Sequence, residues 1–219
     1  MEISHPVQIG ILKQLLFTPK ARFTDLNKFD MTSDQFTYHL KKLIRDRFIE
    51  KENDRYILSR KGRTIAYLIN KSNLIFALQP KTGVLIFIEK LINSEKYILL
   101  GRRKKQPQFG KIGFYAGKII QGTSYLEIIR THIKEETNLD VESYKFKGIV
   151  RIIDKRTLDD RIMFYCQATL YSGLLNSDTI YAANKWYREK DLKNNNRFCK
   201  DFMKDLQLFR SKKTFFLSR

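Results

Sequence analysis

The sequence predicts two domains of mixed α and β structure, an α/β (α+β) fold class. In residues 6–69, apolar side chains recur at helical spacing, interrupted by one polar hairpin turn. From residue 84 onward, apolar and polar residues alternate along several runs, as is typical of strands. Residues 70–83, which contain Asn, Ser, Pro and Gly, lie between the two patterns. We therefore expect domains at 1–71 and 72–219.

Composition excludes several classes of protein. Of 219 residues, 42% are hydrophobic and 13% aromatic, enough for real cores and too many for a disordered chain. No stretch approaches the roughly 18 uncharged apolar residues of a membrane helix, and no secretory signal is visible. Two cysteines, Cys166 and Cys199, cannot form a disulfide framework. We expect a cytoplasmic protein with no membrane partner and with Cys166 in the core.

The chain is strongly basic. Its 42 Lys and Arg against 23 Asp and Glu give a net charge of +19, which favours polyanionic partners; the alternative is a charge that only maintains solubility. Residues 1–72 carry 14 basic and 8 acidic residues, a balance of +6, and residues 73–219 carry 28 and 15, a balance of +13. Because most of the charge lies in the second half, RNA binding by that half stays open as an interpretation.

The first domain reads as helix, helix, helix, hairpin, helix. Residues 6–17 have apolar side chains at helical period, with Pro6 suited to open the helix. Residues 23–29 predict a short second helix with Thr24 as its cap. Residues 48–58 form two β-prone runs around a polar turn, and helical character then returns.

The third helix, within residues 31–50, has the clearest local signature. Thr32 and Gln35 have the spacing of a capping box, and the apolar positions that follow predict one buried face: Phe36, Leu40 and Leu43.

Residues 5–70 resemble a winged helix-turn-helix domain, most clearly in "FTYHLKKLIRDRFIEKENDRYILSRKGR". Such domains place the third helix in the major groove of double-stranded DNA and the hairpin wing along the backbone. The resemblance implies candidates for base contacts at Gln35, Thr37, Tyr38 and His39. It implies candidates for phosphate contacts at Lys41, Lys42, Arg45 and Arg55. The alternative is a winged helix used for protein docking or dimerisation.

The second domain alternates strands with inserted helices, which indicates a sandwich. Two strand-like runs, 84–92 and 96–100, are joined by an Asn-Ser turn. Residues 124–139 predict a helix that starts near Ser124. Long strand-like runs follow, then a segment around Trp186 and a closing helix in "RFCKDFMKDLQLF".

The stretch "THIKEETNLD" contains a candidate metal site. His132, Glu135 and Glu136 stand at i, i+3 and i+4, so on a helix their side chains share one side. Two carboxylates and an imidazole there predict a divalent metal ligand set; the alternative is a solvated helix end.

Residues 72–210 resemble the Nudix fold through "LLGRRKKQPQFGKIGFYAGKIIQG…EIIRTHIKEETNL…NKWYREKDL". Gly117 anchors the Nudix box, and four later positions fall into register: Ile133, Glu135, Glu136 and Leu139. Four positions depart from the box, because Thr123, Thr131, His132 and Asn138 replace Glu, Arg, Glu and Gly. The resemblance implies a Nudix-type α/β/α sandwich with a degenerate box.

The departures predict weak metal binding and poor catalysis. Nudix enzymes hold Mg²⁺ on this helix and cleave nucleoside diphosphate derivatives. A nitrogen ligand from His132 would suit Mn²⁺ better than Mg²⁺. Missing carboxylates would cost decades of rate, since general base catalysis alone contributes about 10²–10⁴-fold. The basic loop at 101–105 offers Arg102 or Arg103 as a phosphate clamp, unless the loop is merely solvated.

We therefore expect a homodimeric DNA-binding transcriptional regulator whose Nudix domain senses a nucleotide-type small molecule with little or no turnover. The alternative is a divergent Nudix hydrolase that uses Glu135 and Glu136 with a divalent metal. Carboxylates outside the box would then complete its site, with Glu127, Asp159 and Asp160 as candidates.

Overall fold

The computed structural model describes residues 3, 5–69, 79–154, 159–193 and 195–219. The chain divides into two compact units, Met1–Leu78 and Gln79–Arg219. The predicted boundary between residues 71 and 72 lies outside the described residues. None of the described helices is long and apolar enough to cross a membrane.

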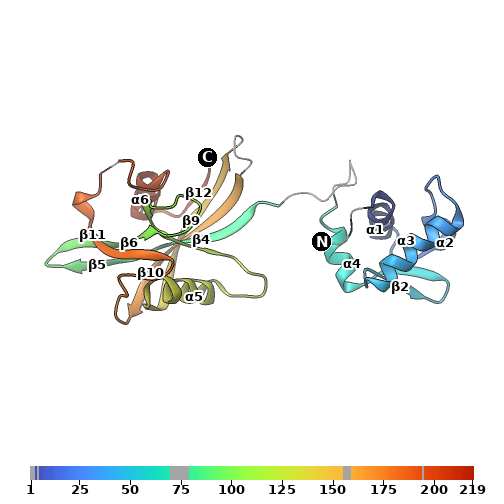
Figure 1. Cartoon of the computed structure of the whole chain (residues 1–219), viewed down its shortest axis with the longest axis horizontal. Helices are drawn as coiled ribbons and strands as arrows, with labels where there is room; N and C mark the ends of the chain where they lie inside the picture. The colour runs from blue at the N-terminus through green and yellow to red at the C-terminus, as the bar shows by residue number, and fades with distance from the viewer. Residues whose placement is uncertain (1–2, 4, 70–78, 155–158, 194) are drawn as a thin grey trace. The chain divides into compact units, whose positions relative to one another are not determined.

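The first unit has the predicted order of elements (Figure 1). Its strands form an antiparallel sheet in the order β1-β3-β2. The helices are α1 (Pro6–Phe17), α2 (Phe23–Leu26), α3 (Ser33–Arg45) and α4 (Arg60–Ala66), and the strands are β1 (Ala21–Arg22), β2 (Ile49–Glu52) and β3 (Arg55–Leu58).

Side-chain caps explain where α2 and α3 begin. The Gln35 backbone N–H donates to Thr32 Oγ1 at 3.3 Å, and the Thr32 N–H donates to Gln35 Oε1 at 3.1 Å, which confirms the predicted capping box. The prediction of Thr24 as the cap of α2 was wrong. The N-cap is Arg22, two residues before Thr24: its backbone N–H donates to Asp25 Oδ2 at 2.8 Å, and the helix starts at Phe23.

A single apolar core holds the first unit together. The buried faces of α1 and α3 supply most of it, and strand and helix residues from the hairpin and α4 complete it. Its fully buried large side chains include Ile11, Leu12, Leu15, Phe36, Leu40 and Leu43.

The second unit contains two sheets. A mixed five-stranded sheet has the order β12-β9-β10-β4-β8, and a four-stranded sheet contains β11-β6-β5 with β7 paired to β6. The strands are β4 (Lys81–Phe87), β5 (Glu89–Ile92), β6 (Glu95–Arg103), β7 (Ile112–Gly113), β8 (Tyr115–Lys118), β9 (Asp140–Asp154), β10 (Asp159–Ser172), β11 (Ala182–Arg188) and β12 (Phe215–Ser218). The predicted Asn-Ser turn joins β5 to β6 with positive φ at Asn93 and Ser94.

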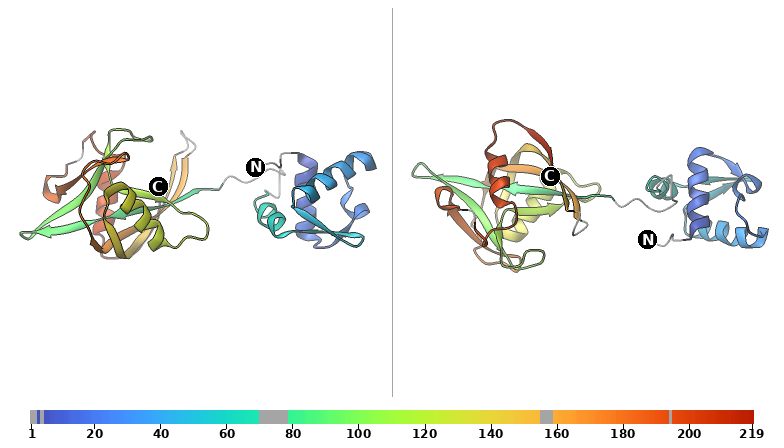
Figure 2. Two further views of the ribbon diagram at one scale, coloured as in Figure 1. Left: turned by 60° about the horizontal axis from the view of Figure 1, so that its bottom comes forward. Right: turned by 90° about the horizontal axis from the view of Figure 1, so that it is seen from above.

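Helices α5 (Tyr125–Thr137) and α6 (Phe202–Arg210) cover opposite faces of strand β4 (Figure 1, Figure 2). Val84 and Ile86 point into the core beneath α5, whereas Phe87 points into the core beneath α6. This alternation follows from the two-residue period of a strand. The predicted α/β/α sandwich is therefore confirmed, and a short 3₁₀ helix at Glu189–Asp191 follows β11.

Strand β12 was not predicted from the sequence. It pairs in parallel with β9, with Phe216 opposite Ile149. Phe215 lies directly against Gly148, where an added Cβ would overlap its ring. The basic, aromatic tail is thus part of the sheet.

Candidate functional site

Helix α5 carries the predicted carboxylates near its C-terminal end. Ser124 caps its start by accepting the Glu127 N–H at 3.2 Å, and Asn138 ends it in the left-handed conformation at φ 65°. Glu135 is exposed, but Glu136 is buried with only 8% of its surface accessible. Adjacent helical residues point about 100° apart, which explains why the two carboxylates have different surroundings.

Glu136 is already paired inside the protein. Its Oε1 accepts from Lys105 Nζ at 2.9 Å. Of the basic loop predicted at 101–105, the first three residues belong to strand β6, and only Lys104 and Lys105 lie in the loop after it. The Glu136 backbone carbonyl accepts from Asn184 Nδ2 at 2.6 Å and from Thr179 Oγ1 at 3.3 Å. The side-chain carboxylate and the backbone carbonyl of Glu136 therefore both accept hydrogen bonds from within the protein.

His132 packs against β8 instead of joining the carboxylates. Its ring lies so close to Gly117 that an added Cβ there would overlap it. Gly117 pairs with Val84 of β4, so the ring rests on the backbone of the sheet. The glycine that anchors the predicted box is thus required by packing.

The donor set does not fit the divalent metal that the box implies. Mg²⁺ and Mn²⁺ require several convergent, mainly oxygen donors, and the Lys105 ammonium beside one of them opposes a second cation. Within the described part of the chain, no three His, Cys, Asp or Glu residues lie close enough to hold a metal. The predicted ligand set of His132, Glu135 and Glu136 is not assembled.

Of the three carboxylates outside the box that could complete a hydrolase site, two form ion pairs with cationic side chains and one is exposed. Asp160 accepts a two-pronged contact from Arg151 at 3.1 and 2.7 Å. Asp159 pairs with Lys81 at 3.3 Å and Arg161 at 3.2 Å. Glu127 lies exposed in the first turn of α5.

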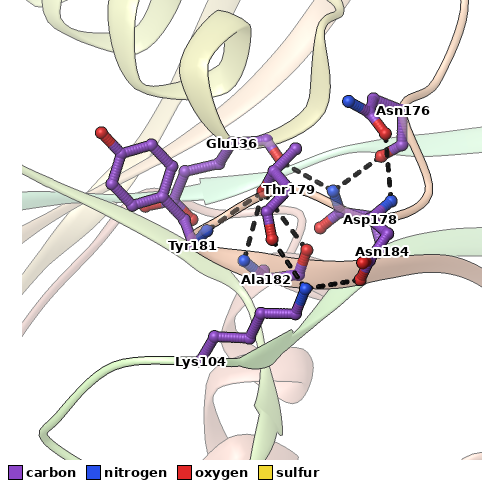
Figure 3. Close-up of polar contacts among 8 residues, drawn as sticks. All are labelled: Lys104, Glu136, Asn176, Asp178, Thr179, Tyr181, Ala182 and Asn184. Carbon is purple, nitrogen blue, oxygen red and sulfur yellow. Dashed lines mark hydrogen bonds and ion pairs between the residues drawn. The ribbon is translucent and has the colours of Figure 1, made fainter.

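Hydrogen bonds connect the segment before β11 to the C-terminal end of α5 (Figure 3). Asn184 bridges the Glu136 carbonyl and the Asn176 carbonyl, the latter at 2.8 Å, and its Oδ1 accepts the buried Tyr115 hydroxyl at 2.9 Å. Burial, and then the nearby negative charge of Glu136, raise the pKa of Tyr115 well above its ordinary value. The hydroxyl therefore stays protonated and donates.

Lys104 fastens the basic loop to the same segment. Its Nζ donates to Asp178 Oδ1 at 2.6 Å and to the Thr179 carbonyl at 2.8 Å (Figure 3). The next residue, Lys105, reaches Glu136 and lies 4.6 Å from the Tyr181 ring centroid. The sequence singled out this loop but not these two lysines, because their partners lie 31 or more residues away.

Arg102 and Arg103 cannot clamp one diphosphate together. Consecutive residues of a strand point to opposite faces, and both belong to β6. Arg102 is exposed. Arg103 donates from Nε to the Pro107 carbonyl at 2.9 Å and lines a cavity beneath α6. Either one alone remains a candidate phosphate ligand.

The cavity beneath α6 has a volume of about 100 Å³ and mixed walls. Its cationic side chains are Arg103, Arg161, Lys200 and Arg219, and its aromatic walls include Phe114, Tyr165 and Phe202. A ligand pocket usually measures about 300–1,000 Å³, so a whole nucleotide does not fit in the form described. The cavity can accept a small group such as a phosphate.

Arg219 fills part of that cavity. Its Nη2 donates to Asp205 Oδ1 at 2.6 Å, and the Tyr165 hydroxyl donates to the same oxygen at 2.6 Å. Burial raises the pKa of Asp205 and, together with the Asp205 charge, raises that of Tyr165. The Arg219 Nε is buried without a hydrogen-bond acceptor among the described residues. Sequence reasoning missed this cluster, since β12 brings its members together.

In the first unit, the predicted DNA-contacting residues lie mostly on the outer face of α3. Tyr38 is 63% exposed. Gln35, Lys41, Arg45 and Arg55 are also exposed, and Thr37 and Lys42 are half-buried. Gln35 is in addition the capping partner of Thr32, which ties its side chain to the start of the helix.

His39 does not belong to this face. It is 8% exposed, its Nδ1 lies 3.5 Å from Gln8 Nε2, and its ring lies against the His5 ring, tilted by 33° with the centroids 4.1 Å apart. Burial lowers its pKa, with smaller repulsive effects from His5 and Lys42. The prediction that His39 contacts a base edge was wrong, because its side chain packs against α1.

The first unit matches a sequence family, whereas the second unit matches solved structures. Residues 1–69 match the family described as "Domain of unknown function (DUF7347)". No curated protein matches the chain. Solved structures match the second unit, and the first two compared below are Nudix proteins.

A MutT NUDIX hydrolase from Burkholderia pseudomallei is 21% identical, with a TM-score of 0.51, over 60% of this chain and 98% of that one. The NUDIX domain of Shewanella oneidensis NrtR, crystallised with ADP ribose, is 17% identical, with a TM-score of 0.52, over 66% and 94%. The second unit has the Nudix fold. A MutT protein from Bacillus halodurans agrees, at 18% identity and a TM-score of 0.50 over 62% and 86%. Helix α5 contains the residues in which the sequence predicts a degenerate Nudix box.

Proposed function

We propose that the chain is a DNA-binding transcriptional regulator whose Nudix unit senses a nucleotide-type ligand with little or no turnover. The observation that carries the proposal is the arrangement of the two carboxylates of α5: Glu136 is paired to Lys105 at 2.9 Å, and Glu135 is exposed to solvent. Metal-assisted cleavage needs convergent carboxylates that hold the ion against the phosphates. The pairing of Glu136 with Lys105 therefore supports ligand binding on a Nudix fold with little or no hydrolysis.

The first unit supplies the DNA-binding half of the proposal. Its element order is that of a winged helix, in which α3 would enter the major groove and the β2–β3 hairpin would follow the backbone. Tyr38 would contact base edges, and Lys41 and Arg45 would contact phosphates. A homodimer would place two such helices on the two halves of a symmetric site.

The second unit supplies the ligand-binding half. Two cationic surfaces, the basic loop after β6 and the cavity beneath α6, can take phosphate groups. ADP-ribose, the ligand in the NrtR domain structure, is a suitable first probe because it carries a diphosphate between an adenosine and a ribose. If it binds one geometry of the dimer better, DNA and ADP-ribose will change each other's affinity by the same factor.

The test is fluorescence anisotropy with labelled duplex DNA over a series of salt concentrations. Lys41→Ala and Arg45→Ala should each lower the salt dependence by about one counterion, the effect of one lost phosphate contact. Lys96→Ala, an equal charge change on β6, is the matched control. Unchanged DNA binding in both α3 variants, or tighter binding of single-stranded RNA at matched salt, would contradict the proposal.

A further inference from the structure

We propose that Lys105 permanently takes the place of the divalent metal at α5, so that the site binds a ligand's phosphate without metal. The inference rests on the proposed ligand binding for its phosphate contact, but not for the exclusion of metal. It concerns the cation that neutralises Glu136, and thus the cofactor requirement of the site.

The position of Lys105 is fixed from several sides. Its Nζ lies 2.9 Å from Glu136 Oε1, and the Glu136 side chain is only 10% exposed. The Tyr181 ring, 4.6 Å away, adds a cation–π contact. The neighbouring Lys104 is fastened to Asp178 and Thr179, which holds the loop backbone in place. Lys105 therefore reaches Glu136 from an anchored loop.

The Lys105 ammonium still has donors to offer. An ammonium carries three N–H groups, and Glu136 takes one. The Lys105 side chain is 47% exposed, so its remaining donors face solvent, where a phosphate oxygen can reach them. A Nudix metal bridges a carboxylate to substrate phosphates. Lys105 can make the same bridge, with one positive charge instead of two.

A metal ion would have little to bind here. Glu136 is paired, its carbonyl already accepts two hydrogen bonds, and the His132 ring rests on Gly117. An incoming cation would have to expel the ammonium from a largely buried carboxylate. Coulomb repulsion between the two cations opposes that exchange.

The first experiment follows free Mn²⁺ by EPR in the presence of the full chain. The wild-type protein should leave the free Mn²⁺ signal unchanged. Lys105→Ala should also leave it unchanged, because Glu136 alone does not supply the several convergent donors that a metal requires. Binding of Mn²⁺ by the wild type that Glu136→Gln removes would overturn the proposal.

The second experiment measures pyrophosphate binding by calorimetry, in EDTA and in Mg²⁺. The wild type should bind in EDTA, and Mg²⁺ should not tighten the binding, because Mg²⁺ forms a complex with free pyrophosphate and adds no ligand to the site. Lys105→Ala should weaken binding about tenfold, the lower end for losing a hydrogen bond to a charged group, because the site is half exposed. Lys96→Ala should not change it. Binding that requires Mg²⁺, or that Lys105→Ala leaves intact, would overturn the proposal.

Lys105→Gln shows whether weaker binding comes from the lost charge or from a folding defect, because the glutamine amide can still donate to Glu136 but carries no charge. It should keep the wild-type melting temperature more closely than Lys105→Ala and still weaken pyrophosphate binding. The Mn²⁺ experiment uses neither nucleotide nor DNA. The metal exclusion can therefore succeed where the regulator proposal fails, and the reverse.

Discussion

Asn184 is the side chain whose removal tests the architecture around α5 most sharply. It is 5% exposed and makes three hydrogen bonds: to the carbonyls of Glu136 and Asn176, and from the Tyr115 hydroxyl. We expect Asn184→Ala to destabilise the Nudix unit, because three polar groups lose a partner at once.

The three losses are unequal. The Glu136 carbonyl keeps its contact with Thr179, and Asn176 is exposed, so water can replace its lost donor. Loss of the partner of the Tyr115 hydroxyl is the most costly, since Tyr115 is 2% exposed and its hydroxyl has no other acceptor among the described residues. A buried group left unsatisfied costs about 1–3 kcal/mol, so we expect a total near 2 kcal/mol.

Urea unfolding followed by tryptophan fluorescence measures this change in the right unit. Trp186 is the only tryptophan of the chain, and it lies on β11 two residues from Asn184. The urea midpoint of Asn184→Ala should fall while its m value stays unchanged. Lys185→Ala, the exposed neighbour, should remain within about 0.5 kcal/mol of the wild type.

A double-mutant cycle isolates the Tyr115 contribution. Tyr115→Phe removes the hydroxyl that has lost its acceptor, so the double variant should be no less stable than Asn184→Ala alone. Strictly additive costs, or an Asn184→Ala variant as stable as the Lys185→Ala control, would refute the reasoning.

Three further outcomes follow. Because burial lowers the pKa of His39 from 6.5, the unfolded chain takes up a proton that the folded unit does not. The free energy of unfolding of the first unit, measured by hydrogen exchange of α3 amides, should therefore fall as the pH drops through 6.5. The fall should be smaller in His39→Gln. Burial raises the pKa of Cys166 to about 12 and also raises that of Cys199. DTNB should therefore label Cys199 first and Cys166 only on unfolding, and the Cys199→Ser variant should lose the first reaction. Gly117→Ala should cost about 1–3 kcal/mol by overlap with the His132 ring, as measured by urea unfolding, and His132→Ala should restore most of the loss.

Local signals in the sequence predicted local structure well. The Thr32 and Gln35 capping box, the cap at Ser124 and the turn at Asn93 are each determined by residues within four positions of one another. Cys166 in the core is likewise confirmed, because the apolar strand around it predicts burial.

The misassigned His39 could have been placed correctly. It stands three residues after Phe36 and four before Leu43, so it falls within the apolar stripe of α3. The resemblance to a DNA-reading helix led to its assignment to the outer face.

Contacts between distant segments could not be predicted. Lys105 and Glu136 are separated by 31 positions, and no local pattern pairs them. Arg219 meets Asp205 and Tyr165 only because β12 adds to the sheet beside β9. The sequence alone identified Glu135 and Glu136 as candidate carboxylates, whereas the groups that surround them depend on the tertiary fold.

The most direct test of the account is one titration of the full chain with ADP-ribose, in EDTA, Mg²⁺ and Mn²⁺, with melting temperature and products measured in the same samples. We predict stabilisation in all three without cleavage; ligand at about 100 times its Kd adds roughly 2.7 kcal/mol. Metal-dependent release of AMP, abolished by Glu135→Gln with Glu136→Gln, would contradict the account and identify a hydrolase.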